Sequence, residues 1–196
     1  MSRIQRLPIE EWDPELRDAV HLDAMLPFQR NGMEISAHAP HMAKAMGAFF
    51  AISKAGQTLP ARLVELVRLR VAFHNQCRSC MAMRYQSGID DGVTEDLVCS
   101  LEKPMEAPDL TDAERAALGF ADLFANNHLA IDDKVYDNLR KYFTESEIVE
   151  LGMFVASFVG FGRLAATFDM VEELPESFQD KSVKIGPWAD AGVPVS

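Results

Sequence analysis

Two cysteines separated by two residues carry the clearest chemical signal in the chain, in the segment Cys77-Arg78-Ser79-Cys80. At a helix start this spacing puts both sulfurs on one face, close enough to bridge, while backbone N–H groups and the helix dipole stabilise a thiolate. Asn75 is the expected N-cap of that helix. A thiol of pKa ~8.5 is only a few per cent thiolate at neutral pH, whereas one near ~6.5 is mostly thiolate. The sequence therefore predicts a redox-active pair.

Three nearby side chains are candidate catalytic helpers. Glu65 lies on the preceding helix, His74 precedes Cys77 by three residues, and Arg84 follows Cys80 by four. A cation one helical turn from Cys80 would favour its thiolate. The sequence predicts that these groups surround the sulfurs.

Each helper also has a structural interpretation. Glu65 belongs to the core-facing part of its helix, where an unpaired carboxylate is costly, so a salt bridge to Arg68 or Arg62 would account for it. His74 could simply end its helix, and Arg84 could be an ordinary surface arginine.

The pair itself has two alternatives. Two cysteines can serve as small buried apolar side chains. Structural zinc would need two more ligands, which Cys99 and His74 could supply only if the fold brought them to the pair. The sequence has no second Cys-x-x-Cys, no glycine-rich phosphate loop, no Gly-x-Ser-x-Gly and no His-Glu-x-x-His. It therefore predicts neither a metal nor a cofactor.

The elements that must position these residues are helices. Apolar residues recur at helical spacing nearly everywhere, and no strand pattern stands out. Thr111-Asp112-Ala113-Glu114 and Thr144-Glu145-Ser146-Glu147 have the form of capping boxes that begin two helices. The sequence predicts an all-α fold with helices near 14–29, 37–54, 59–74, 77–88, 94–101, 112–127, 132–142 and 145–169.

Domain organisation is simple for a chain of this length. The predicted parts are an N-terminal helical extension over 1–34, a helical domain over 35–170 and an irregular C-terminal arm over 171–196. Pro175, Gly186-Pro187 and Pro194 prevent a long helix in the arm. Ile185 and Trp188 would dock it on something, such as a neighbouring subunit, unless the terminus is loosely held.

One internal similarity bears on the architecture. Leu63-Val64-Glu65-Leu66 and Ile148-Val149-Glu150-Leu151 are 85 positions apart, and at the same offset Gly162 and Ala165 stand where the first copy has Cys77 and Cys80. This pattern fits a degenerate two-copy helical repeat, or a chance agreement of two amphipathic helices.

Composition excludes several function classes. The 196 residues carry a net charge of −11 with no Lys/Arg block, which disfavours nucleic acid and membrane surfaces as partners. No secretory signal and no apolar run near ~18 residues is evident, so we expect a cytoplasmic protein. Thiols are kept reduced there, and three cysteines are then no disulfide framework.

Glu65, eleven intervening residues and Cys77-Arg78-Ser79-Cys80 on an all-helical chain resemble the AhpD-like alkylhydroperoxidase and carboxymuconolactone decarboxylase family. The block from Leu63 to Gly88 is similar to the core of that family. Gly162-Arg163-Leu164-Ala165 is similar to its later segment, so the resemblance covers about residues 35–170.

The resemblance implies a compact helical subunit that forms a symmetric homo-oligomer. It also implies that Cys80 attacks an organic hydroperoxide, that Cys77 resolves the sulfenic acid to a disulfide, and that Glu65 belongs to the proton relay. An external dithiol, or exchange with the disulfide of a partner protein, completes the cycle.

One departure from the family pattern affects the chemistry. The family has histidine four residues after the second cysteine, where this chain has Arg84, which cannot pass a proton. His74 would take over the relay, Glu65 would act through water, or peroxidase activity would be weak. Helix-terminus physics favours Cys77 as the attacking thiol, whereas the resemblance and the position of Arg84 favour Cys80.

Three function classes follow from this sequence. The first is a cofactor-independent thiol peroxidase or disulfide oxidoreductase in antioxidant defence. The second is cofactor-free decarboxylation of a small lactone acid on the same fold, which would not need the cysteines. The third is a non-catalytic, redox-sensing helical assembly, in which the pair alters packing without turnover.

Overall fold

The computed structural model describes residues 2–188, and this part of the chain is all-α, as the sequence predicts, with no β-strand. The longer helices are α2 (Pro27–Ser36), α3 (Pro40–Ala55), α4 (Ala61–Asn75), α8 (Asp112–Asn126) and α10 (Glu145–Phe168). The shorter ones are α1 (Pro14–Ala19), α5 (Arg78–Met81), α6 (Gln86–Asp90), α7 (Glu95–Cys99) and α9 (Asp133–Leu139). Single 3₁₀ turns cover Ile9–Glu11, Leu22–Ala24, Ser100–Glu102, His128–Ala130 and Glu176–Phe178.

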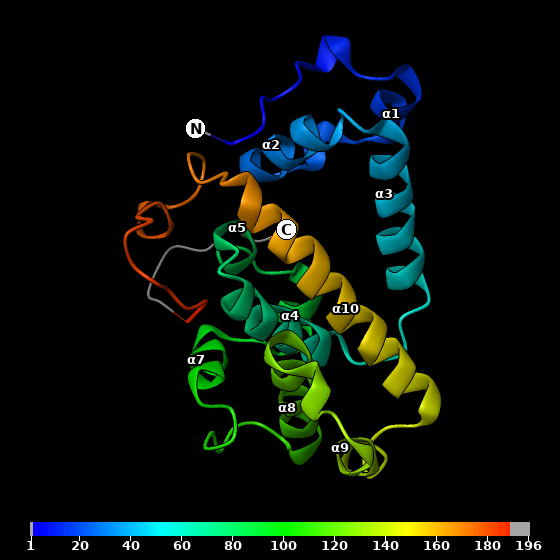
Figure 1. The fold of residues 1–196 in the computed structure, drawn as a ribbon, viewed down its shortest axis with the longest axis vertical. Coiled ribbons are helices and arrows are strands. Elements are labelled where there is room, and N and C mark those ends of the chain that lie inside the picture. The colour runs from blue at the N-terminus through cyan, green and yellow to red at the C-terminus, as the bar shows by residue number, and fades with distance from the viewer. Residues whose placement is uncertain (1, 189–196) are drawn as a thin grey trace.

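The core forms around α4, which packs against α8 and α10 more extensively than any other pair of elements (Figure 1). Leu66, Val67 and Leu69 of α4 have no exposed surface, nor have Leu118 of α8 and Val155 of α10. Helices α1, α2 and α3 form an outer arc along one side in Figure 1. The core helices thus fix the end of α4, from which the cysteine segment emerges.

Both predicted capping boxes are confirmed. Thr111 Oγ1 accepts a hydrogen bond from the Glu114 N–H at 3.2 Å, and Glu114 Oε2 accepts one from the Thr111 N–H at 2.7 Å. Thr144 and Glu147 make the same reciprocal pair at 3.3 and 2.8 Å. Each pair satisfies two backbone donors that a helix start leaves without partners.

Two predicted helices are wrong in extent. The stretch predicted as one helix over 14–29 is α1, a 3₁₀ turn and then α2, because Pro27 has no N–H to continue a helix and instead opens α2 as its first residue. The stretch over 77–88 is a single turn, α5, followed by α6. The reason for this second break lies in the site and is given below.

Helix α10 is apolar enough to cross a membrane by length and composition, with a mean hydropathy of 1.6 in its best window. This contradicts the expectation that no segment of the chain is apolar over the length needed to cross a membrane. The helix packs on α4 and α8, with Leu151, Phe154 and Val155 buried. Its packing in the core accounts for part of this composition, since 39% of that window is buried.

Residues 171–188 of the predicted C-terminal arm dock on the same chain, and the arm's remaining residues lie outside the described part. Phe178 is fully buried, and the Trp188 ring lies 4.7 Å from the Phe73 ring, centroid to centroid. The predicted boundary at residue 34 falls inside α2. Both the domain division and the two-copy repeat stay predictions.

Two glycines of α10 provide a stability test of the α4–α10 contact. A Cβ at Gly162 would lie 2.5 Å from Asn75 Nδ2, whereas one at Gly160 would meet nothing within 4 Å. We expect Gly162→Ala to lower the free energy of unfolding by about 1–3 kcal/mol through overpacking. Gly160→Ala should raise it by about 0.5–1 kcal/mol through helix propensity. Urea unfolding of the two variants measures both effects, and equal changes would contradict the packing described.

Candidate functional site

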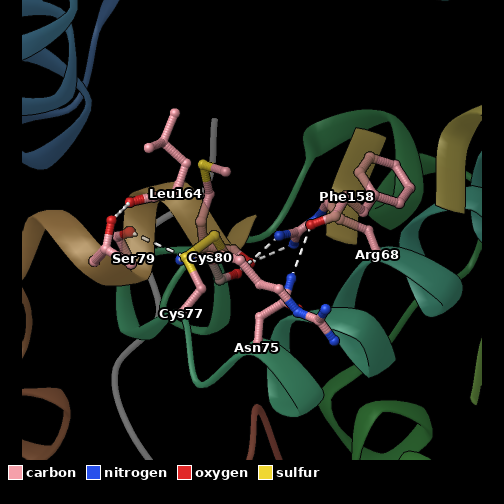
Figure 2. Close-up of a disulfide and its surroundings, with 10 residues drawn as sticks. Arg68, Asn75, Cys77, Ser79, Cys80, Phe158 and Leu164 are labelled. Atoms are coloured by element: carbon pink, nitrogen blue, oxygen red, sulfur yellow. Dashed lines mark hydrogen bonds between the residues drawn. A yellow bond between two sulfur atoms is a disulfide. The ribbon is translucent and has the colours of Figure 1, made fainter. Parts of the chain in front are cut away.

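The cysteine pair lies where the chain leaves α4. Gln76 ends that helix in the left-handed conformation, with φ 49°. Cys77 and Cys80 then form a disulfide across the single turn of α5, with their Cα atoms 5.2 Å apart (Figure 2). Cys77 is fully buried, while Cys80 is partly exposed and lines a cavity. The two sulfurs therefore differ in access.

The cap of α5 differs from the prediction. Cys77, not Asn75, is the N-cap, and its Sγ accepts a hydrogen bond from the Cys80 N–H at 3.4 Å. Asn75 is instead the last residue of α4, where its Nδ2 donates to the Phe158 carbonyl of α10 at 2.8 Å (Figure 2). Because α5 has only four residues, its dipole is small, and the expected helix-terminus advantage of Cys77 is weak.

Glu65 makes the structural ion pair that the sequence left open, and its partner is Arg68. The carboxylate, 1% exposed, accepts from Arg68 Nε at 2.6 Å and Nη2 at 2.7 Å. Arg62, the other candidate, pairs with Glu114 at 2.6 Å. Burial alone would lower the pKa of Arg68, but the Glu65 carboxylate more than compensates and holds this pKa above its usual value.

Arg68 explains why the predicted helix over 77–88 breaks. Its Nη1 donates to the Cys80 carbonyl at 2.7 Å (Figure 2). Its Nη2 donates to the Met83 carbonyl, also at 2.7 Å. The Tyr85 N–H, in turn, donates to Glu65 Oε1 at 3.0 Å. These backbone groups find side-chain partners in place of helical ones, so the chain can turn away from α5 and still satisfy its buried polar groups.

The close approach of α6 to this ion pair requires glycine. A Cβ at Gly88 would lie 2.7 Å from Glu65 Cβ. Gly88, part of the block that carries the family resemblance, thus leaves room for Glu65 beneath α6.

Tyr85 is a polar residue of the site that the sequence analysis missed. Its ring stacks on Arg68, with the guanidinium carbon 4.4 Å from the ring centroid. Burial raises the pKa of its phenol, and the nearby Arg68 charge only partly opposes this. In the described part of the chain, every fully buried side-chain oxygen or nitrogen has a hydrogen-bond partner. The Tyr85 hydroxyl has no such partner among the described residues. That hydroxyl therefore keeps accessible surface, and Tyr85 lines the same cavity as Cys80.

Arg84, in contrast, points its charge away from the sulfurs. It is 1% exposed, so it is no surface arginine, and its Nε and Nη2 bind Glu95 at 2.9 and 3.0 Å. Its remaining N–H groups donate to the carbonyls of Met81, Met83 and Pro187. All five donors are therefore occupied, and none is left for a thiolate.

His74 also faces another partner. Its Nε2 lies 2.7 Å from Asp122 Oδ1 and its Nδ1 lies 3.2 Å from Asn126 Nδ2, both on α8. Arg70 binds the same carboxylate at 2.7 Å. Burial raises the pKa of Asp122, but the hydrogen bonds from His74 and Arg70 outweigh it and hold this pKa below its usual value. His74 thus joins α4 to α8 and is not a wall of the Cys80 cavity.

The cavity beside Cys80 has a volume of about 390 Å³ and largely apolar walls. Helices α2, α3 and α10 supply most of the apolar side chains, which include Phe28, Met33, Met46, Phe50, Phe158, Phe161 and Phe168. Its polar lining residues include Arg68, Asn75, Ser79 and Tyr85 from α4 and the stretch that follows it, together with Gln29, Ser36 and Ser157 from α2 and α10. A pocket of this size and lining suits a small organic molecule with one polar end.

The structure therefore brings together Cys77, Cys80 and, through Arg68, Glu65, but neither His74 nor Arg84. The sequence offers Arg68 as one of two partners for Glu65, and the i+3 relation between these residues favours the ion pair that the structure shows. For Tyr85 no local signal exists, because its role depends on a turn that two arginines create.

Residues 40–123 match the sequence profile of the carboxymuconolactone decarboxylase family. Among solved structures, an uncharacterized peroxidase-related protein with an alkylhydroperoxidase AhpD core from Ralstonia eutropha superposes with a TM-score of 0.68 at 20% identity, covering 91% of this chain and 94% of that one. The fold is thus AhpD-like, and residues 40–123 are similar to the carboxymuconolactone decarboxylase family.

Other relatives agree on the fold. An Agrobacterium tumefaciens protein of unknown function, whose suggested role is that of the antioxidant defence protein AhpD, is 25% identical with a TM-score of 0.59, over 68% of this chain and 91% of that one. A cysteine variant of the debrominase Bmp8, in complex with 2,3,4-tribromopyrrole, is 19% identical with a TM-score of 0.68, over 88% and 94%.

The relatives found by sequence do not indicate an activity for this chain. Two uncharacterized proteins from strains of Mycobacterium tuberculosis are 38% identical over 89 residues. The match covers 44% of this chain and 31% of the relatives' own length.

Proposed function

We propose that the protein is a cofactor-independent thiol peroxidase that reduces organic hydroperoxides. The observation that carries the proposal is the unequal access of the two bonded cysteines: Cys80 lines an apolar cavity and Cys77 is buried behind it. Exchange with a partner's disulfide would use the same sulfur. The cytoplasmic location and the external dithiol reductant stay predictions that fit this chemistry.

The reaction balances with the groups present once the disulfide is reduced. The Cys80 thiolate attacks the distal peroxide oxygen, the O–O bond breaks, and the alkoxide takes a proton to leave as the alcohol. Cys77 then attacks Cys80 Sγ, a disulfide forms, and hydroxide takes a second proton to leave as water. The two thiols supply both protons and both electrons, and an external dithiol restores them by thiol–disulfide exchange.

Tyr85 is the proton donor in this scheme, in place of the family histidine that Arg84 replaces. Its raised pKa keeps the phenol protonated, Tyr85 lines the cavity that Cys80 also lines, and the scheme places its hydroxyl beside the bound peroxide. Arg68, held by Glu65, lies over the Tyr85 ring and would stabilise a transient phenolate. Glu65 then acts by holding Arg68 and the Tyr85 backbone, and passes no proton itself.

The direct test is one equivalent of cumene hydroperoxide added to the dithiol form. We expect the loss of two thiols, a mass decrease of two hydrogens, and one cumyl alcohol per disulfide. With excess dithiothreitol the reaction should turn over many times. Reduced protein that keeps both thiols would overturn the proposal.

Related assays separate the alternative functions. Cofactor-free lactone decarboxylation would continue unchanged when Cys77 is replaced by serine. A redox-sensing assembly would form the disulfide once without sustained turnover. Release of bromide from 2,3,4-tribromopyrrole without peroxide turnover would instead indicate the activity for which the Bmp8 neighbour is named.

Removing the phenol hydroxyl tests the proton donor. We expect Tyr85→Phe to slow sulfenic acid formation by about 100-fold, the lower end for a lost general acid. Stopped-flow measurement of the first turnover gives this rate and its pH profile, in which the phenol's high-pH limb should disappear. Tyr136→Phe, on the exposed surface of α9, is the matched control and should change neither. An unchanged profile in Tyr85→Phe would exclude it as the donor.

The homo-oligomer implied by the family resemblance also remains a proposal. Neighbouring parts of α3 and α10 expose large apolar side chains, among them Ile52 at 73% and Met153 at 61%. A second copy packed on this face would remove them from water. We expect Met153→Lys to reduce the mass measured by light scattering to that of one chain, whereas Lys134→Glu, at an exposed position of α9, should not.

A further inference from the structure

A second cavity, of about 370 Å³, adjoins the one beside Cys80. The two share three wall residues: Ser79 of the cysteine segment, Ala165 of α10, and Met170. Beyond these shared walls the lining changes character. The first cavity is mainly apolar, whereas the second is bounded by charged and polar residues of the N-terminus, the cysteine segment and the C-terminal arm.

The charge of the second cavity is opposite to that of the chain as a whole. On a protein of net charge −11, the described residues of its walls include Arg3, Arg78, Lys181 and Lys184, against a single carboxylate, Asp169. That carboxylate binds Lys181 at 2.6 Å. A positive pocket on an acidic protein attracts anions selectively.

Three of these cations have no carboxylate partner among residues 2–188. Arg3, Arg78 and Lys184 form no salt bridge with any residue of the described chain. The pKa of Asp180 is lowered mainly by hydrogen bonds from Ser182 and to a smaller extent by the charge of Arg78. The three side chains are instead held in other ways. Arg3 donates to the Thr167 carbonyl, Arg78 to two carbonyls of the arm, and the Lys184 ammonium lies 5.5 Å from the Phe73 ring centroid.

These contacts leave donors free for a ligand. A guanidinium has five N–H groups and an ammonium three. Arg3 uses one of its donors on Thr167, Arg78 uses two on the arm, and Lys184 uses none on a described acceptor. An entering carboxylate would therefore find charge-assisted donors without displacing an existing ion pair.

We propose that the two cavities bind the two ends of one ligand, an amphipathic organic acid. Its apolar body, with the hydroperoxide, occupies the cavity at Cys80, and its carboxylate occupies the basic cavity beyond Ser79. This rests on the proposed function and specifies its substrate class: hydroperoxides of carboxylic acids are preferred over neutral ones. The carboxylate makes ion pairs only and takes no part in the redox step.

The test is a binding measurement that needs no turnover. Phenylalkanoates from 3-phenylpropionate to 6-phenylhexanoate, each with its neutral amide, are titrated by calorimetry into the disulfide form. We expect the best acid to bind about ten-fold more tightly than its amide, which corresponds to ~1.4 kcal/mol, and to lose this advantage in high salt. Cumyl alcohol should compete with the acid, because both need the apolar cavity.

Variants locate the anion. Lys184→Gln should weaken acid binding about three-fold, and Arg3→Gln/Lys184→Gln about ten-fold, with amide binding unchanged. Lys134→Gln, an exposed cation on α9, is the matched control and should have no effect. Equal affinities of acid and amide, or acid binding that cumyl alcohol does not affect, would overturn the two-ended site.

The outcomes also separate this inference from the proposed function. A protein that prefers acids but never consumes peroxide retains the two-ended site and loses the peroxidase assignment. A protein that reduces peroxides with no preference between an acid and its methyl ester retains the peroxidase assignment and loses the two-ended site.

Discussion

Cys80→Ser is expected to abolish peroxide reduction, lowering the single-turnover rate at least ~1000-fold, because the attacking thiolate is removed and a serine hydroxyl is not ionised at neutral pH. Cys77→Ser should keep the first step and stop there. With no resolving sulfur, a sulfenic acid should accumulate on Cys80 and be trapped by dimedone, one label per chain. Peroxide titration with intact mass measurement distinguishes the two variants.

Cys99→Ser is the control for these substitutions. Cys99 is exposed on α7, away from the cavity, and its Sγ lies 3.9 Å from the Trp188 carbonyl. Its removal should leave both steps unchanged. If Cys77→Ser lost the first step while Cys80→Ser kept it, the attacking sulfur would be Cys77, and access through the apolar cavity would not determine reactivity.

Arg68→Met is expected to lower the free energy of unfolding by about 3–5 kcal/mol, the cost of leaving one partner of a buried ion pair uncompensated. The Glu65 carboxylate would lose its counter-charge, and the carbonyls of Cys80 and Met83 would lose their donor. The substitution therefore affects the cysteine turn as well as the core. Urea unfolding of the oxidised protein measures the loss.

Two comparisons sharpen this prediction. Glu65→Leu/Arg68→Met should recover part of the stability, because no buried charge then remains unpaired. Arg140→Met removes a cation from an exposed pair with Glu145 and should cost far less than Arg68→Met. Equal losses at Arg68 and Arg140 would show that the buried pair has no special structural role.

Local signals predicted much of the fold. The two capping boxes mark helix starts at Asp112 and Glu145 because they satisfy backbone donors within four residues of sequence. The apolar periodicity of α4, α8 and α10 also identifies the core helices, because it too is a pattern of residues close together in the sequence. The prolines at 27 and 40 are equally local signals, because each is the first residue of its helix, α2 or α3.

The site was predicted only in part, because its geometry depends on contacts distant in sequence. The Cys77–Cys80 bridge follows from spacing alone. The direction of Arg84 does not, since its partners include Glu95 and the Pro187 carbonyl of the arm. His74 likewise turns to Asp122, 48 residues away.

The C-terminal arm is held to the rest of the chain by hydrogen bonds to its peptide groups as well as by buried side chains such as Phe178. Gln76 donates to the Ile185 carbonyl and accepts from its N–H, Arg78 holds the carbonyls of Phe178 and Val183, and Arg84 holds that of Pro187. A carbonyl is the same whatever side chain follows it. Substitutions at exposed arm residues such as Val183 should therefore disturb the docking of the arm less than substitutions at Gln76, Arg78 or Arg84, whose side chains bind its backbone.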